Sequence, residues 1–260
     1  MTPAEVEKIK EILPTTLGSD EIRERFAADI LRRSVFSARM ASAAYLKKVR
    51  EVCTAMSAGE INQADARAQL LTVLEQLGHS PLDDGGLKNP ASIRRLNLIL
   101  ETQTQMAASV ARLSEQTEGT LAQYPAWELT RLESRAVPRM DWAARWRAAG
   151  EACGWEGASQ GPRMIALKSS PIWAELGNGA GGFKDTLGNP YPPFAYSSGL
   201  DWIDVSREDA QKLGLVVDDV REMNEKPSLS PSERDIAEAI ARYGFPEIGE
   251  GLDVAGLEVS

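Results

Sequence analysis

The residues best suited to chemistry gather in one acidic segment, which holds Asp201, Asp204, Glu208 and Asp209. Paired carboxylates carry out glycoside hydrolysis, and carboxylate oxygens also bind divalent cations. A capping box that begins at Ser206 accounts for Asp209, and the positive end of the same predicted helix accounts for Glu208. We therefore interpret Asp201 and Asp204 first as surface acids. A cation-dependent hydrolase that uses Asp201, Asp204 and Glu208 stays open as the alternative function.

A serine-type triad or a two-histidine zinc site would have to use His79, the only histidine. His79 follows Gly78 at the end of a predicted helix, where a histidine can meet the last carbonyl groups. Cys53 and Cys153 lie far apart and belong to no Cys-x-x-Cys motif, which favours two incidental thiols in a reduced chain. The sequence thus predicts no metal, no cofactor and no catalytic set. We expect a structural or interaction protein, not an enzyme.

One glycine pattern, Gly177-x-Gly179-x-x-Gly182, matches the dinucleotide-binding fingerprint in its letters. That fingerprint needs a strand before the glycines and a helix after them. Here a short helix is predicted before them and no helical pattern follows. We interpret the segment as a flexible loop.

Basic residues are concentrated in one segment of a chain whose formal net charge is −9. The overall charge argues against a general nucleic-acid coat, which needs a basic surface. The basic segment is opposed nearby only by Asp29 and Glu51, and its cations are Arg32, Arg33, Arg39, Lys47, Lys48 and Arg50. We interpret them as one helix face about five turns long. The face is either solvated or in contact with an acidic partner or DNA phosphates.

A second segment is rich in proline and aromatic residues. Two adjacent prolines fix two φ angles and remove two amide donors, so this backbone is stiff and cannot be helical. We call its main residues the proline-aromatic group, which consists of Trp173, Tyr191, Pro192, Pro193, Phe194 and Trp202. The group is interpreted as a core or a docking surface. We expect its aromatic side chains to be largely buried and packed together.

The elements that position these residues begin with a helical first half. Apolar periodicity predicts one long or once-broken helix from Glu21 to about Ser57. A second helix is expected between the Asn62 cap and Gly78, and a third between the Ser92 cap and Gly119. Short connections would pack them as an antiparallel bundle within residues 1–120.

Residues 121–218 are predicted to form a small domain with few strands, short helices and much loop, so the fold class is α+β. Trp127–Leu132 has strand-like content and can pair with Met164–Leu167. Between these strands, Trp142 and Trp146 lie on one face of a predicted helix.

Residues 219–260 are predicted to be an acidic C-terminal tail with one short helix, from Ser230 to Tyr243. The chain begins without a secretory signal pattern, and no apolar run is long enough for a membrane span. We expect no membrane contact and a place in the cytoplasm or in an assembly.

Several short motifs follow one another between about Ser92 and Gly214. They are Leu100–Thr104 in the third helix, the Trp127–Leu132 strand, Arg135 and Pro138 in the turn, Pro171–Trp173, and Tyr191–Pro193. In this order they resemble the phage head morphogenesis family, the Mu F-like minor head proteins. Many members have Cys-x-Cys where this chain has Ser197–Leu200, and a histidine where it has Met140-Asp141. We therefore expect no metal site of the kind suspected in those members.

The resemblance implies a structural minor head protein of a tailed phage or prophage. Such a protein would act in capsid assembly near the portal and bind portal and/or capsid proteins. It would be present in several copies in the virion head, and in the host cytoplasm during assembly. Packaged DNA would be an additional contact.

Overall fold

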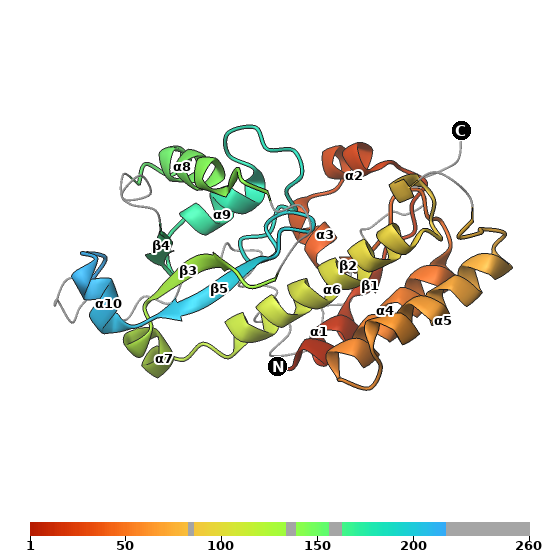
Figure 1. The fold of residues 1–260 in the computed structure, drawn as a ribbon, viewed down its shortest axis with the longest axis horizontal. Helices are drawn as coiled ribbons and strands as arrows, with labels where there is room; N and C mark the ends of the chain where they lie inside the picture. Colours follow the sequence, from red (N-terminus) through yellow and green to blue (C-terminus); the bar gives the residue numbers. More distant parts are fainter. Residues whose placement is uncertain (83–85, 134–138, 156–162, 217–260) are drawn as a thin grey trace, which may run out of the picture.

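The structure is a computed structural model that describes residues 1–82, 86–133, 139–155 and 163–216. It has an N-terminal lobe of helices and a C-terminal lobe built on a small sheet (Figure 1). The fold is therefore mixed α+β, as the sequence predicts. Among the helices described, none is both long and apolar enough to cross a membrane.

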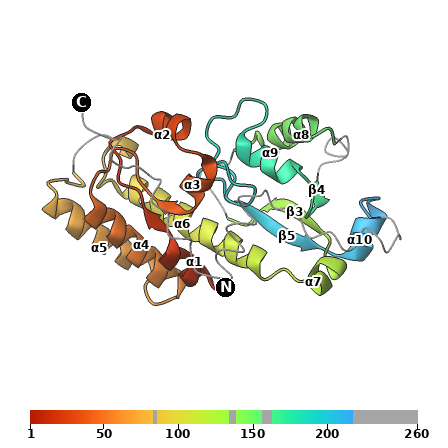
Figure 2. The same ribbon diagram turned by 180° about the vertical axis from the view of Figure 1, so that it is seen from behind.

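The N-terminal lobe packs helices beside a short pair of parallel strands. Its elements are α1 (Pro3–Ile9), β1 (Glu11–Ile12), α2 (Ser19–Arg25), α3 (Ala28–Arg32), β2 (Ser34–Val35), α4 (Ala43–Ser57), α5 (Gln63–Gln76), the 3-10 helix η1 (Gly86–Lys88) and α6 (Ile93–Ser114). The core lies between α4, α5 and α6, which contribute the fully buried Leu46, Leu70 and Leu96. Helix α1 lies against α4 and α6 (Figure 2).

The predicted starts of α5 and α6 are confirmed. The side chains of Asn62 and Ser92 accept hydrogen bonds from amides three residues further on, at 3.0 and 3.3 Å. Gly78 follows α5 with φ 83°, in the left-handed conformation that glycine favours at helix ends. Helix α6 ends before the predicted Gly119, which lies in the next helix, α7 (Glu118–Gln123).

The prediction of one long or once-broken helix from Glu21 to Ser57 is wrong. This segment contains α2, α3, β2 and α4. Strand β2 is buried and pairs in parallel with β1, so the chain must leave the helical conformation there. Helix α4 starts at its own cap, Ser42, which accepts from the amide of Tyr45 at 3.2 Å. Apolar periodicity did not reveal this break, because β2 is stabilised by pairing with β1, and the sequence predicted no element in the segment that contains β1.

The C-terminal lobe is built on an antiparallel sheet of three strands. After α7 its elements are β3 (Ala126–Arg131), α8 (Trp142–Ala152), β4 (Met164–Leu167), α9 (Ile172–Asn178), β5 (Leu200–Val205) and α10 (Arg207–Lys212). The strand order is β4-β3-β5. The predicted pairing of β3 with β4 is confirmed, with Trp127 opposite Ala166. Strand β5 was not predicted; it pairs along the other edge of β3, with Trp202 opposite Leu129.

The proline-aromatic group lies in the core of the C-terminal lobe, as predicted for its aromatic members. Trp127 and Trp202 are stacked with ring centroids 3.7 Å apart. Trp173 meets these two rings edge-on, at 5.9 and 5.6 Å between centroids. The segment Tyr191–Phe194 is buried throughout. In this chain the group is therefore core and not an exposed docking surface.

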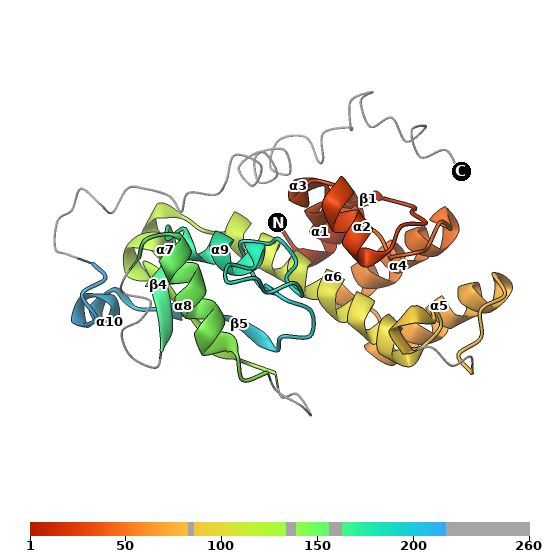
Figure 3. The ribbon, with the colours of Figure 1, turned by 90° about the horizontal axis from the view of Figure 1, so that it is seen from above.

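Helix α6 belongs to both lobes, and it crosses from one to the other when seen from above (Figure 3). Leu96 and Leu100 from its first half pack in the N-terminal core. Met106, Val110 and Leu113 from its second half pack in the core that holds the tryptophans.

Candidate interlobe site

The six cations of the predicted basic face lie on three separate segments. Arg32 is the last residue of α3 and Arg33 is its C-cap, Arg39 lies in the loop after β2, and Lys47, Lys48 and Arg50 belong to α4. Arg39 and Lys47 are exposed, and the others are half-buried. The prediction of a single continuous helix face is therefore wrong, because the long helix that was to carry it is interrupted.

Three of these cations bind partners within the N-terminal lobe. Lys48 pairs with Glu51 at 2.7 Å, and Arg33 forms a longer pair, 3.7 Å, within α3. Arg50 donates to the carbonyl oxygen of Lys10 at 2.8 Å. These three cations therefore stabilise contacts within the N-terminal lobe.

A cavity of about 650 Å³ lies between the two lobes. Its walls come from α2, α3, the loop after β2, η1, α6, the end of α9 and the segment around Gly188. Among the described residues that line it, five are cationic and one is acidic: Arg23, Arg32, Arg39, Lys88 and Arg95, with Asp20. Arg32 and Arg39 are the two members of the predicted basic face that this cavity brings together.

Arg95 is the most deeply buried cation of the cavity wall, with 7% of its surface exposed. Its guanidinium donates to Ser37 Oγ at 2.7 Å and to the Lys88 carbonyl at 3.2 Å, and also to the Leu87 and Ala38 carbonyls. Burial lowers the pKa of Arg95, and the nearby charge of Arg39 acts in the same direction. Because the partners that hold Arg95 are uncharged, its positive charge is not neutralised by them.

Two arginines of the N-terminal lobe reach across to the C-terminal lobe. Arg32 Nη1 donates to the Gly188 carbonyl at 2.8 Å, and Arg23 Nη1 donates to the Lys184 carbonyl. Gly188 has φ 73°, and a Cβ placed there would lie 3.2 Å from the Cβ of Ala28 in α3. Glycine thus provides both the left-handed backbone and the close approach of the lobes.

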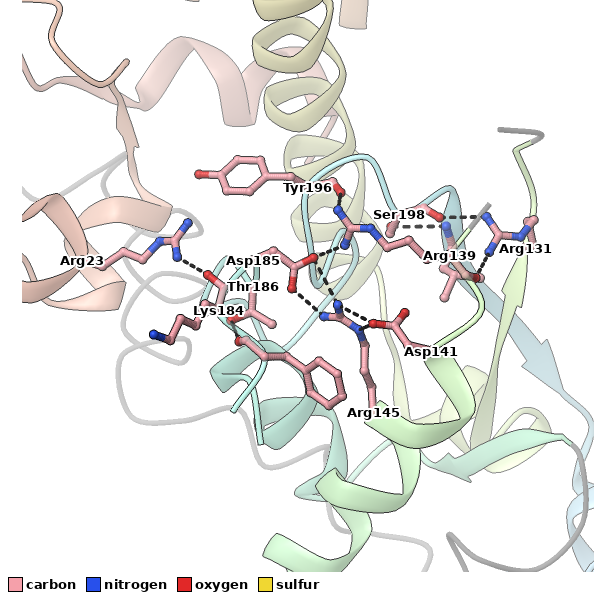
Figure 4. Close-up of polar contacts among 12 residues, drawn as sticks. Arg23, Arg131, Arg139, Asp141, Arg145, Lys184, Asp185, Thr186, Tyr196 and Ser198 are labelled. Carbon is pink, nitrogen blue, oxygen red and sulfur yellow. Dashed lines mark hydrogen bonds and ion pairs between the residues drawn. The ribbon is translucent and has the colours of Figure 1, made fainter. Parts of the chain in front are cut away.

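A network of arginines and aspartates holds the C-terminal side of this junction (Figure 4). Arg145 of α8 makes a two-pronged contact with Asp185, with Nη1 and Nη2 at 2.8 and 3.1 Å from the two carboxylate oxygens. Its Nη2 also donates to Asp141 Oδ2 at 2.9 Å. Arg139 binds the same Asp185 carboxylate and donates to the Tyr196 carbonyl at 2.7 Å.

Asp185 is the central acid of the network, and its ionisation reflects two opposing effects. Burial alone would raise its pKa, but the hydrogen bonds and charges of Arg145 and Arg139 outweigh burial and hold the pKa below its usual value. Arg131 extends the network by donating to the carbonyls of Ser198 and Arg139, at 3.0 and 3.2 Å. These contacts anchor the long segment between α9 and β5 to α8 and β3.

Sequence reasoning missed the residues that form this junction. Arg145 and Asp185 are separated by 40 positions, and Arg95 binds Ser37 across 58 positions. One signal was available: Arg145 lies on α8 between two buried tryptophans, where an arginine needs a partner.

The carboxylates of the alternative hydrolase are each engaged with a different cation. Asp201 binds Arg112 at 3.2 Å, and Asp204 binds Lys168 at 2.7 Å. Glu208 pairs with Lys212 at 2.7 Å, one turn along α10. In the ranges that the structure covers, no group of three or more His, Cys, Asp or Glu residues is arranged to hold a metal ion.

The remaining candidates have structural surroundings. Asp209 lies in the first turn of α10, and its amide donates to Oγ of the predicted cap, Ser206, at 3.1 Å. The amide of His79 donates to the Leu74 carbonyl at 2.9 Å, at the end of α5. Gly177 lies in the last turn of α9, so the glycine pattern follows no strand and is not a nucleotide fingerprint.

Comparisons of this chain with protein-family models, with curated proteins and with solved structures found no match. Its function must therefore be argued from its own residues and geometry.

Proposed function

We propose that the protein is a structural minor head protein of a tailed phage or prophage. It acts in capsid assembly near the portal, binds portal and/or capsid proteins in several copies in the virion head, and contacts packaged DNA as a further partner. In this proposal it performs no covalent chemistry.

The proposal rests on where the structure places the motifs that carry the resemblance. The strand with Trp127, the Pro171–Trp173 element and the Tyr191–Pro193 element are far apart in the sequence but pack into one core. Trp173 links two of them, because its Nε1 donates to the Leu167 carbonyl at 2.9 Å and its ring meets Trp127. Their packing into one core is what three motifs of a single domain should show, and the step from this domain to a head function is by analogy with the family.

The alternative, a cation-dependent hydrolase, loses its main support. A pair of catalytic carboxylates, or a cation site, needs acids that converge on one point. Here each of the three acids, Asp201, Asp204 and Glu208, forms an ion pair with a separate cation. Asp204 also accepts a hydrogen bond from Trp127 Nε1 at 3.1 Å. Asp201 and Asp204 connect β5 to other segments, and Glu208 pairs within α10.

The test is co-assembly. The chain is co-expressed with the portal and major capsid proteins of the same genome, and head-sized particles are separated by sedimentation. We expect the protein to sediment with the particles when the portal is present and to remain near the top of the gradient without portal and capsid proteins. A chain that stays near the top with both proteins present contradicts the proposal.

The partner surface is tested within the same experiment. Arg39 and Lys47 are the exposed members of the predicted basic face, whereas Arg50 is engaged inside the lobe. Exposed ion pairs contribute about 0–1 kcal/mol each. We expect the double reversal of Arg39 and Lys47 to Glu to reduce incorporation and to make it less sensitive to salt. An unchanged incorporation across a salt series removes these two cations from the proposal.

A further inference from the structure

The cations at the interlobe cavity carry more positive charge than neighbouring carboxylates neutralise. In the Arg145 network, Arg145 and Arg139 each meet a carboxylate, but Arg95 is held by carbonyls and a hydroxyl. The Arg39 side chain makes no hydrogen bond or ion pair with any residue that the structure describes, and Lys88 is exposed. The cavity therefore offers two accessible cations beside a fixed, buried one.

Arg39 is held in an unusual backbone conformation. Its φ is 56°, a left-handed value that costs a non-glycine residue about 1 kcal/mol or more. Its amide donates to the Leu17 carbonyl at 2.9 Å, which fixes this conformation. The guanidinium lies at Gly18, where an added Cβ would be 3.7 Å from Nη2. The Glu21 carboxylate also lies at Gly18, where it accepts from the Gly18 amide at 2.6 Å as part of the α2 cap and opposes part of the Arg39 charge.

Part of the remaining wall is apolar. Phe26, Phe36, Leu98, Ile99 and Met106 line the same cavity as the cations. A volume of about 650 Å³ falls within the range of roughly 300–1,000 Å³ that is typical of small-molecule sites. A bare inorganic ion would leave most of this space and its apolar surface unused.

We propose that the interlobe cavity binds a small organic phosphate. The phosphate is held by Arg39 and Lys88 in the field of Arg95, and the organic part lies against Phe26 and Phe36. Arginine forks match the oxygens of a phosphate, and a dianion suits a cavity wall with five cations and one acid better than a single carboxylate does. This site goes beyond the proposed head function and does not depend on it.

Ligand binding should also stabilise the folded chain. The segment around Gly188, which Arg32 contacts, lines the same cavity. A ligand in this cavity binds the folded chain and not the unfolded chain, so it raises the unfolding temperature.

The experiment is calorimetric titration of the purified full chain with AMP and, separately, with inorganic phosphate, at low salt. The variants are Arg39→Gln and Lys88→Gln, which remove exposed cations of the cavity. The matched control is Lys47→Gln, an equally exposed cation on α4 that does not line the cavity. Thermal unfolding of each variant without ligand shows that it is folded.

We expect AMP to bind the wild type at least about tenfold more tightly than inorganic phosphate does, because the apolar wall adds contacts. Arg39→Gln should weaken AMP binding about tenfold, and Lys88→Gln should weaken it less, since an arginine fork makes two charge-assisted bonds. Lys47→Gln should leave AMP affinity within about twofold, because Lys47 does not line the cavity.

Absence of a binding heat with AMP overturns the proposal. Equal affinity for AMP and inorganic phosphate overturns the role of the apolar wall, and equal losses in Lys47→Gln and Arg39→Gln show nonspecific attraction. No portal or capsid protein is present in this titration, so its failure is separate from a failure of the head-protein proposal.

Discussion

Two buried tryptophans offer a matched test of how the C-terminal core is stabilised. Trp173 and Trp202 are 3% and 2% exposed and lie in the same aromatic cluster. Their indole groups differ in one respect: Trp173 Nε1 donates to the Leu167 carbonyl at 2.9 Å, whereas the buried Trp202 Nε1 has no partner among the described residues. Replacing each with Phe removes the same atoms but only one hydrogen bond.

The magnitudes follow from this difference. At both sites Trp→Phe loses packing contacts worth about 1–2 kcal/mol. At Trp173 one net hydrogen bond of about 1 kcal/mol is also lost; the Leu167 carbonyl is not orphaned, because it still accepts from the Ser170 amide at 3.0 Å. At Trp202 the substitution removes an unsatisfied buried N–H, which returns about 1–3 kcal/mol. We therefore expect Trp173→Phe to cost about 2–3 kcal/mol and Trp202→Phe at most about 1 kcal/mol.

The assay is urea unfolding followed by far-ultraviolet circular dichroism, because each substitution changes the tryptophan fluorescence. Trp173→Ala and Trp202→Ala serve as controls for burial and should each cost about 3–5 kcal/mol. If the two Ala variants lose equal stability and Trp202→Phe costs as much as Trp173→Phe, the hydrogen-bond reasoning is refuted. If Trp202→Ala leaves stability unchanged, its place in the core is refuted.

Two further substitutions test backbone packing and the ion network. Gly177→Ala would place a Cβ 1.8 Å from the Asn189 carbonyl oxygen, so it should cost about 3 kcal/mol or more in thermal unfolding. Gly119→Ala, whose Cβ meets nothing closer than 3.8 Å, should stabilise α7 by up to about 1 kcal/mol; a similar loss at both glycines would count against the close approach. Because the folded pKa of Asp185 is lowered, its pairing with Arg145 contributes stability above the unfolded pKa of about 4, and this contribution is lost as the pH falls through the folded value. Asp185→Asn should therefore be less stable than the wild type near neutral pH, and acid titration of both proteins should show the difference shrinking; a constant difference would exclude this linkage.

Local signals predicted the parts of the fold that depend on local structure. The caps at Asn62, Ser92 and Ser206 each supply a side-chain oxygen to the amides at the start of a helix, so neighbouring residues suffice to identify them. The burial of Trp173 and Trp202 was also predictable, because large aromatic side chains beside a stiff proline segment have little alternative to a core.

The parts that sequence reasoning missed depend on distant partners. Strand β2 is specified by its pairing with β1, and apolar spacing alone made the same residues look helical. The charge network shows the same limit, because Arg145 is indistinguishable in sequence from a solvated helix arginine until Asp185 is brought to it. The cavity forms where the two lobes pack against each other, and no local sequence pattern predicts that packing.

The shared helix α6 has a consequence for exchanging parts of this chain with those of a relative. A crossover in the middle of α6, between Leu100 and Met106, would keep each half of the helix with its own lobe, since Leu96 and Leu100 serve one lobe while Met106 and Val110 serve the other. A crossover before Leu96 would instead leave native Leu96 and Leu100 in contact with a foreign core. In a viable chimera with a foreign N-terminal lobe, Leu96 and Leu100 therefore come from the foreign chain and the native Met106 face of the helix is kept.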